Sequence, residues 1–251
     1  MIPIDLSGHT AVVTGASGQL GRAMVRTLAR AGADVAVCYL NNRSKADELA
    51  AQVQAMGRRS IVVQVDVTAA DAINALRDRV AAELASADII VNNAVIQYPW
   101  KSILDQPSAD FESQFRSCVM HNVLMAQAFV PGMVARKWGR VIGINTECAM
   151  QCAAGQGAYA SAKRGMDGVL RVLAREVGQH GITVNEIAPG WTISEDQADG
   201  SPQAYRDTLP LRRRGSDQEI ANVVAFVASD LASYITGAYI PVCGGNIMPA
   251  I

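Results

Sequence analysis

Short apolar runs rich in Val and Ile alternate along this chain with amphipathic stretches rich in Ala, Leu and Arg. This alternation predicts βαβ units, in which a helix returns the chain to the same edge of the sheet after each strand. Most of the apolar runs do not alternate with polar residues, so we expect a parallel sheet covered by helices on both faces. The predicted strands are residues 9–14, 34–39, 60–66, 87–93, 139–146, 183–188 and 239–242.

The alternation continues through all 251 residues without a Pro/Gly/Ser linker, a charge block or an internal repeat. We therefore expect one doubly wound α/β domain over residues 1–251, with ligands at the carboxyl ends of the strands. The least regular part is residues 191–210, which mix Asp, Gly, Ser and Pro. We interpret this segment either as a mobile loop over the site or as a plain surface insertion.

Several predicted helices carry signals at their ends. The segments Thr68-Ala-Ala-Asp71 and Ser216-Asp-Gln-Glu219 have the form of N-terminal capping boxes. Gly32 and Gly57 stand where a helix would stop, because glycine readily adopts the left-handed conformation that often ends a helix.

Composition argues against several classes of protein. Half of the residues are apolar and 22 basic side chains balance 23 acidic ones, which does not suit a nucleic-acid binder. No apolar run is long enough to cross a membrane, and residues 1–5 do not resemble a secretion signal, so we expect a cytoplasmic protein. The cysteines are odd in number and lack zinc spacing, which predicts buried free thiols and no metal site. They are Cys38, Cys118, Cys148, Cys152 and Cys243.

A glycine-containing segment, residues 14–21, follows the first predicted strand and leads into a helix. Such a turn needs residues without Cβ so that the backbone can approach a pyrophosphate at the positive end of the helix. A tight turn without a ligand is the alternative, but the position on the first βα unit favours a Rossmann-type dinucleotide site. The residues expected at the cofactor are Gly15, Ser17, Gln19, Leu20 and Gly21.

The end of the second strand bears on the choice of cofactor. A carboxylate there would bind the ribose of NAD and repel the extra phosphate of NADP. This chain instead has Tyr39 followed by Asn42, Arg43 and Ser44, which could bind a phosphate, so NADP is favoured and NAD stays possible. The alternative is that Arg43 and Lys45 only decorate the start of a surface helix.

Small polar residues also close the third and fourth strands. Asp66-Val67 ends the third, where a carboxylate could bind the adenine amino group. Asn93 and Ala94 follow Asn92 at the end of the fourth and could line the cofactor groove. Each of these residues, taken alone, could also be a simple turn residue.

The segment Tyr159-Ala-Ser-Ala-Lys163 carries the strongest chemical signal. A helix brings positions i and i+4 onto one face, so the phenol and the ammonium can serve the same site. A nearby cation favours the phenolate and lowers the pKa of Tyr159 from about 10 toward the working range, which suits a general acid or base. Thr146 ends the fifth strand and could hold the substrate oxygen. Asn122 could hold a water that passes protons to Lys163, or could be a core amide bonded to its neighbours.

From residue 9 to residue 245 the chain resembles the single-domain branch of the short-chain dehydrogenase/reductase family, in particular 3-oxoacyl-carrier-protein reductases and related carbonyl reductases. The resemblance rests on residues 14–21, Asn92-Asn93-Ala94, Asn122, Tyr159 with Lys163, Thr183-Val184-Asn185 and Pro189-Gly190. It implies a catalytic set of Asn122, Thr146, Tyr159 and Lys163, with Lys163 also on the nicotinamide ribose. It further implies that the nicotinamide is bordered by Pro189, Gly190, Thr192 and Ser194, and that the protein is a homotetramer.

Four positions depart from the family pattern. Gln19 stands where the single-domain branch has its middle glycine, and Thr146 replaces the usual Ser. Val95 follows the Asn-Asn-Ala segment in place of Gly, and Cys243 replaces the Asp that precedes two glycines. The added methyl group of Thr146 stiffens its side chain and crowds the pocket, so we expect slower catalysis or a narrower set of substrates.

These observations lead to an NADP-dependent oxidoreductase that moves a hydride between the nicotinamide and a ketone, an aldehyde or a secondary alcohol, with Tyr159 as general acid or base. The alternatives are an NAD-dependent alcohol dehydrogenase and a catalytically weak nucleotide-binding regulator. The substrate is a small molecule that the sequence does not identify, and Arg136, Lys137 and Arg140 could instead serve a carrier protein. The candidate pocket residues are Gln97, Tyr98, Trp100, Glu147, Met150, Gln151 and Trp191.

Two predicted helices, residues 110–136 and 159–179, carry apolar residues on more than one face. A monomer would leave such faces partly exposed, which favours association. The residues concerned are Val119, Val123, Phe129 and Val134.

Overall fold

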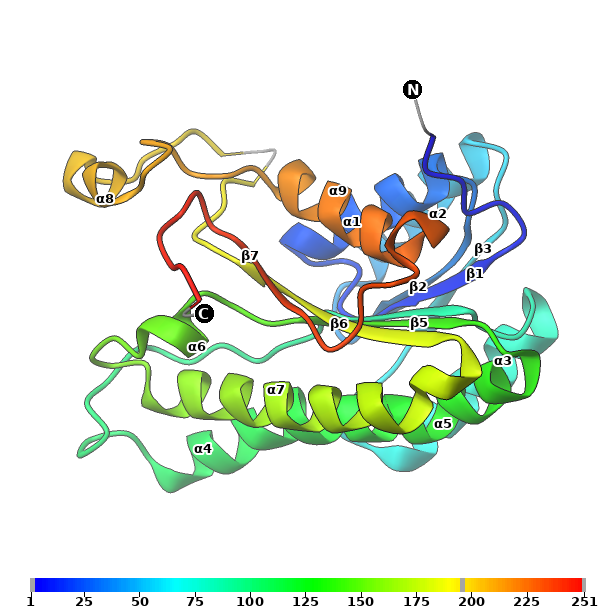
Figure 1. Cartoon of the computed structure of the whole chain (residues 1–251), viewed down its shortest axis with the longest axis horizontal. Helices are drawn as coiled ribbons and strands as arrows, with labels where there is room; N and C mark the ends of the chain where they lie inside the picture. Colours follow the sequence, from blue (N-terminus) through cyan, green and yellow to red (C-terminus); the bar gives the residue numbers. More distant parts are fainter. Residues whose placement is uncertain (1–2, 195–196, 250–251) are drawn as a thin grey trace.

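The structure is a computed structural model that describes residues 3–194 and 197–249. Within these residues, seven parallel strands form one sheet in the order β3-β2-β1-β4-β5-β6-β7 (Figure 1). The chain therefore adds β2 and β3 on one side of β1, and then β4 to β7 on its other side. The predicted Rossmann-type α/β fold is confirmed.

Every predicted strand is present, although several end earlier than predicted. Thr14, Asp66 and Thr146 follow their strands and use their side chains in local hydrogen bonds at the edge of the sheet. The strands are β1 (Thr10–Val13), β2 (Asp34–Tyr39), β3 (Ser60–Gln64), β4 (Ile89–Asn92), β5 (Gly139–Ile144), β6 (Ile182–Pro189) and β7 (Tyr239–Val242).

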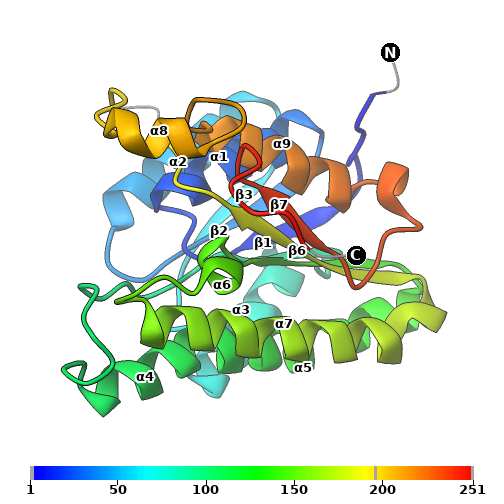
Figure 2. The same ribbon diagram turned by 60° about the vertical axis from the view of Figure 1, so that its left-hand side comes forward.

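Helices cover both faces of the sheet, as Figures 1 and 2 show from two directions. One face is covered by α1 (Gln19–Arg30), α2 (Arg43–Ala55) and α9 (Asp217–Ala228). The other is covered by α3 (Ala70–Glu83), α5 (His121–Arg136) and α7 (Gly157–Val177), with α4 (Ser108–Phe115) beside α7. Two short helices, α6 (Cys148–Gln151) and α8 (Gln203–Thr208), lie in the connections at the carboxyl edge of the sheet. Because β1, β2, β4 and β5 are buried on both faces, their mostly apolar sequences are explained.

A π-helical segment, Arg116–Met120, joins α4 to α5 without a break. The combined helix over residues 108–136 is long and apolar enough by itself to cross a membrane, but 56% of its most apolar window is buried in the fold. Val119 and Phe129 are among the buried residues. Intrachain packing therefore explains two of the four apolar residues that favoured association, while Phe115 and Val172 are the large hydrophobic residues exposed on these helices.

The structure confirms three of the four predicted helix ends. Ser216 and Glu219 form a reciprocal capping box at α9, and Gly32 and Gly57 have φ angles of 105° and 77° just beyond α1 and α2. The capping box predicted at Thr68 is wrong. Oδ1 of Asp66 accepts hydrogen bonds from both the backbone N–H and the hydroxyl of Thr68, so α3 begins later, after Ala69.

Candidate active site

The candidate site lies where the two halves of the sheet diverge, between the carboxyl ends of β1 and β4. Loops from neighbouring parallel strands leave the sheet in opposite directions at such a point, which opens a crevice for a ligand. The glycine-containing turn comes from β1, and Thr146 comes from β5. Tyr159 and Lys163 reach the same edge from the first turns of α7.

The glycine-containing turn fits a pyrophosphate. Gly15 has a φ of 61°, and a Cβ there would lie 2.9 Å from the Cα of Ala94. A Cβ at Gly21 would lie 2.4 Å from the carbonyl oxygen of Gly15, so α1 packs directly on the turn. Gly18 occupies the N-cap position of α1, and within the described chain no side chain caps this end. Backbone N–H groups at the positive end of a 12-residue helix are thus available to an anion.

Thr14 and Asn93 hold this turn against the end of β4. The Thr14 hydroxyl accepts hydrogen bonds from the backbone N–H groups of Asn93 and Ala94, at 2.9 and 3.1 Å. The Asn93 side chain donates to the carbonyl oxygens of Thr14 and Gly15, at 3.0 and 3.1 Å. Asn93 therefore acts on the cofactor site by fixing the backbone of the turn.

Two predicted cofactor residues direct their side chains elsewhere. Gln19 donates from Nε2 to Asp217 on α9 at 3.1 Å, which leaves its backbone for a cofactor. The Tyr39 side chain is 5% exposed and packs in the apolar core. Leu20 lies in the first turn of α1, and Ser17 immediately precedes Gly18 in the turn itself.

The residues predicted to bind a phosphate gather at the start of α2. The Asn42 side chain caps the helix by accepting from the N–H of Lys45 at 3.1 Å. Arg43 and Ser44 point along the exposed surface and bond residues one turn later, Asp47 and Glu48. Since the Arg43 side chain is 74% exposed, turning it toward a phosphate requires only the loss of a weak surface ion pair. At the next strand, Asp66 is engaged with Thr68, and Val67 is half-buried beside it.

Lys163 is 3% exposed, and its ammonium donates to the carbonyl oxygen of Ile144 at the end of β5. Its Nζ atom lies 5.8 Å from the centre of the Tyr159 ring. Burial raises the pKa of Tyr159 above its usual value of 10, and nearby Cys148 adds to this effect. Lys163 was expected to lower the pKa of Tyr159. In the structure this pKa is raised instead, because desolvation of the phenolate prevails.

Thr146 is fixed from several sides. Its hydroxyl accepts from the N–H of Cys148 at 3.2 Å and lies within hydrogen-bonding reach of the Tyr159 phenol. Its backbone N–H donates to Oδ1 of Asn145 at 2.9 Å, and its carbonyl oxygen accepts from the hydroxyl of Tyr239. The two hydroxyl groups predicted to act together are thus neighbours.

The Asn122 side chain is fully engaged within the fold. Its Oδ1 accepts from Asn92 and its Nδ2 donates to the carbonyl of Cys118, both at 2.7 Å. The alternative of a core amide bonded to its neighbours therefore describes this side chain. His121, directly before it, is buried, and among the described residues its Nε2 has no hydrogen-bond partner. Burial and then the charge of Lys163 lower the pKa of His121 to about 3, so its ring is neutral.

Residues 189–194 border the other side of the site. The carbonyl of Pro189 accepts from the N–H of Glu147 at 2.9 Å, and the N–H of Gly190 donates to Val242 at 3.1 Å. Thr192 offers its carbonyl to Arg214, and Ser194 is 7% exposed. The predicted loop continues through residues 195 and 196, which lie outside the described residues, and then forms α8.

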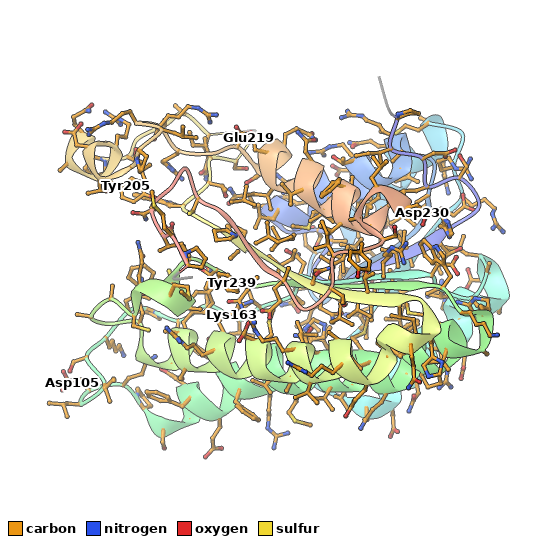
Figure 3. All side chains as sticks on the ribbon, viewed as in Figure 1. Asp105, Lys163, Tyr205, Glu219, Asp230 and Tyr239 are labelled. Carbon is orange, nitrogen blue, oxygen red and sulfur yellow. The ribbon has the colours of Figure 1, made fainter. Side chains whose placement is uncertain are left out.

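Arg214 holds this loop in place. Its guanidinium donates to the carbonyl oxygens of Trp191 and Thr192 and to the carboxylate of Asp199, and it lies 4.2 Å from the centre of the Trp191 ring. Trp191 in turn makes an edge contact with Tyr205 of α8 at a ring distance of 5.0 Å. Figure 3 shows Tyr205 above the carboxyl edge of the sheet.

Among the candidate pocket residues, Glu147 carries a buried carboxyl group. It is 5% exposed, and it accepts from Asn246 at 2.9 Å and from the backbone N–H of Trp191. Burial raises the pKa of its carboxyl group. Tyr98 donates to Ser113 at 2.6 Å. The remaining candidates are exposed at the rim: Gln97, Trp100, Met150, Gln151 and Trp191.

Sequence reasoning missed several residues that support the site. Asn145 and Tyr239 fix Thr146, Glu186 bonds Asn145, and Arg214 holds the loop. Most of their partners are distant in sequence, so no local pattern identifies them. A charged residue inside the buried strand β6 was the one available signal, and it pointed to Glu186.

Known proteins resemble this chain along its whole length. Residues 15–246 match the profile of a family described as enoyl-(acyl carrier protein) reductase. The chain is 36% identical to the 3-oxoacyl-[acyl-carrier-protein] reductase FabG of Pseudomonas aeruginosa, over 98% of this chain and 100% of that protein. A solved short-chain type dehydrogenase/reductase from Mycobacterium marinum superimposes with a TM-score of 0.88 at 28% identity, covering 98% of each chain. The chain belongs to the short-chain dehydrogenase/reductase family.

Family membership confirms the predicted resemblance and makes the protein an oxidoreductase that acts on carbonyl or alcohol groups. Another similar structure is a blue fluorescent protein from a metagenomic library in complex with NADPH. It has a TM-score of 0.89 and 31% identity, and the match covers 97% of this chain and 100% of that one.

The structure gives physical reasons for two of the departures from the short-chain dehydrogenase/reductase pattern. Gln19 ties the start of α1 to α9 through Asp217, a contact that a glycine cannot make. The Cys243 thiol accepts from the N–H of Ile247 at 3.5 Å and is 9% exposed, so it supports the turn that follows β7. Nothing in the structure explains Val95.

Proposed function

We propose that this protein is an NADP-dependent reductase of a small ketone or aldehyde, which also runs in reverse as a secondary alcohol dehydrogenase. The observation that carries the proposal is the meeting of Thr146, Tyr159 and Lys163 at the carboxyl edge of the sheet, beside a helix N-terminus with no side-chain cap in the described chain. The two hydroxyl groups can bind a carbonyl oxygen, and the helix N-terminus beside them can bind the pyrophosphate of a dinucleotide.

Tyr159 is the proposed proton donor to the carbonyl oxygen. Because burial raises its pKa, the phenol is protonated at neutral pH and can act as a general acid. The Thr146 hydroxyl would hold the same oxygen and stabilise the negative charge that develops on it. Lys163 would bind the nicotinamide ribose and add positive charge beside Tyr159. The nicotinamide supplies or accepts the hydride when it is bound.

Asn122 is proposed to serve proton supply to Lys163. Since both ends of its side chain are bonded within the fold, a water would be held by its backbone carbonyl. The neutral, unpaired Nε2 of His121 offers a further acceptor near the same ammonium.

The proposed cofactor site uses backbone groups more than side chains. Residues 15–21 would hold the pyrophosphate, and Ala94 and residues 189–194 would border the nicotinamide. Asp66 and Val67 would lie at the adenine. The preference for NADP rests on Arg43 and Ser44, whose surface positions allow them to turn toward a phosphate at the start of α2.

A small-molecule substrate is favoured over a carrier protein docked on Arg136, Lys137 and Arg140. Arg140 is buried and pairs with the exposed Asp230, and Arg136 pairs with Asp88, so the charges of Arg136 and Arg140 are not free. Both lie at the amino ends of the strands, and Figure 3 shows Asp230 at the opposite end of the molecule from Tyr205. We further propose a cytoplasmic homotetramer, with the exposed Phe115 and Val172 of α4 and α7 in its interfaces.

A panel of ketones, aldehydes and secondary alcohols, assayed with NADPH and NADH and with their oxidised forms, tests this proposal. We expect kcat/KM at least about tenfold higher with the phosphorylated cofactor, equivalent to about 1.4 kcal/mol from one charge-assisted phosphate contact. A tenfold preference for NADH would contradict the cofactor assignment, and the absence of turnover with every pair would contradict the enzymatic assignment.

A further inference from the structure

A buried carboxyl group lies directly behind the candidate site. Glu186 is in the middle of β6 and is 2% exposed. The carboxyl group of Asp167, one helical turn after Lys163 on α7, lies within hydrogen-bonding reach of it. Two carboxylates at this distance repel each other in a poorly solvated environment, so one of them holds a proton.

Asn145 connects Glu186 to the catalytic residues. Its Nδ2 donates to Oε2 of Glu186 and, at 3.1 Å, to the backbone carbonyl of Lys163. Its Oδ1 accepts from the backbone N–H of Thr146 at 2.9 Å. The Asn145 side chain therefore links the end of β5 to both α7 and β6, and Glu186 is its hydrogen-bond partner on β6.

Charged and titratable groups face Glu186 from two elements. Lys163, Asp167 and Arg171 come from α7, and Tyr239 comes from β7. Figure 3 labels Lys163 and Tyr239, which lie between β7 and α7. Burial, with a smaller contribution from Asp167, raises the pKa of Glu186 to about 8, although the hydrogen bond from Asn145 and the charge of Lys163 oppose the shift.

We propose that Glu186 holds a proton at neutral pH beside the carboxyl group of Asp167, which pairs with Arg171, and that the protonated Glu186, acting through Asn145, is a positioning residue for Thr146 and Lys163. The inference rests on the catalytic roles proposed above for these two residues. The proton lies on Oε1 of Glu186, so Oε2 remains the acceptor for Asn145. When the proton leaves, it can reach solvent through Asp167, whose side chain is 31% exposed.

Loss of that proton changes the site. An ionised Glu186 attracts the Lys163 ammonium, which competes with the carbonyl of Ile144 that now holds it. It also repels Asp167 on the same helix. Both effects move Lys163 relative to Tyr159, so we expect alkaline pH to impair proton transfer.

The first test is the pH profile of alcohol oxidation. In this direction ionisation of Tyr159 raises the rate with pH, whereas ionisation of Glu186 lowers it, so the two effects have opposite signs. We expect the rise of the wild-type kcat with pH to weaken above about pH 8, which leaves it roughly fivefold or more below that of Glu186→Gln at higher pH. Glu186→Gln cannot ionise at this position, so its kcat should keep rising with pH as Tyr159 ionises.

Two further variants separate hydrogen bonding from charge. Glu186→Met removes the acceptor for Asn145 and should lower kcat about tenfold at every pH with little change in KM, while Glu186→Gln should recover most of that loss. Asp167→Asn removes the neighbouring charge, so the rise of its kcat should weaken at a lower pH than in the wild type. A pH profile of the same shape in wild type, Glu186→Gln and Asp167→Asn would overturn the inference.

The second test needs no turnover. The folded pKa of Glu186, about 8, lies above the unfolded value of 4.5, so its stabilising contribution is complete below 4.5 and is lost as pH rises through 8. The melting temperature of the wild type should therefore fall relative to that of Glu186→Gln between about pH 4.5 and pH 8. A constant difference over this range would overturn the proton on Glu186. If Tyr159→Phe were fully active, the proposed function would fail while this measurement still decided the state of Glu186.

Discussion

Replacing Gly21 with Ala sets two opposing effects against each other. Gly21 lies in the first turn of α1, where Ala would be favoured over Gly by up to about 1 kcal/mol in an exposed helix. The new Cβ, however, would lie 2.4 Å from the carbonyl oxygen of Gly15 and 2.7 Å from the Cα of Ala16. Both are backbone atoms, which cannot rotate away, and both distances are at least about 0.8 Å shorter than an ordinary contact of about 3.5 Å.

The clash should prevail. Overpacking of this kind costs about 1–3 kcal/mol, so we expect a net destabilisation of up to about 2 kcal/mol. That corresponds to a fall in Tm of roughly 2–8 °C for a chain of this size. Gly15 must move by several tenths of an ångström or more, so the backbone N–H groups of the turn no longer fit a pyrophosphate. The Kd for NADPH should therefore rise at least about tenfold.

Gly168→Ala is the matched control. Gly168 lies in α7, and a Cβ there meets nothing within 4 Å. This variant should be more stable than the wild type by about 0.5–1 kcal/mol and should keep its affinity for NADPH. Thermal unfolding and the fluorescence of bound NADPH measure both quantities. An affinity of Gly21→Ala within twofold of wild type would refute the assignment of residues 14–21 to the cofactor.

Three smaller predictions follow from single side chains. Arg43→Ala should raise KM for NADPH about tenfold and leave KM for NADH unchanged, and equal effects on both would contradict a phosphate contact. Ser216→Ala removes the cap of α9 and should lower Tm by roughly 2–4 °C, for a loss of about 1 kcal/mol. Arg214→Met releases the carbonyls of Trp191 and Thr192, so limited proteolysis should cut near residue 200 faster than in wild type, and an unchanged rate would contradict this role of Arg214.

The sheet could be predicted because its strands are recorded locally in the sequence. A strand buried on both faces is mostly apolar, and β1, β2, β4 and β5 follow this pattern apart from single polar residues such as Asp34 and Arg140. The capping box at Ser216 could be predicted for the same reason, since its partners are three residues apart. At Thr68 the same pattern was misleading, because the side chain of Asp66 took the groups that the box would have used.

The placement of Tyr159 and Lys163 on one face of a helix was predictable from their spacing, but their electrostatics were not. The sequence places Lys163 beside Tyr159, whereas the pKa of the phenol depends on how much protein surrounds it. The contacts that support Thr146 could not be predicted from the sequence either. Asn145 meets Glu186 across 41 positions, and Tyr239 meets Thr146 across 93 positions.

Tyr159→Phe tests the central claim most directly, with Tyr234→Phe as control because Tyr234 is fully exposed. The two variants should be compared for kcat with the best substrate of the panel and for the Kd of NADPH. We expect Tyr159→Phe to lose at least about 100-fold in kcat, which is the contribution of a general acid, while its Kd for NADPH stays within about threefold of wild type. The Tyr234→Phe variant should match the wild type in both. A Tyr159→Phe enzyme with wild-type kcat would contradict the account.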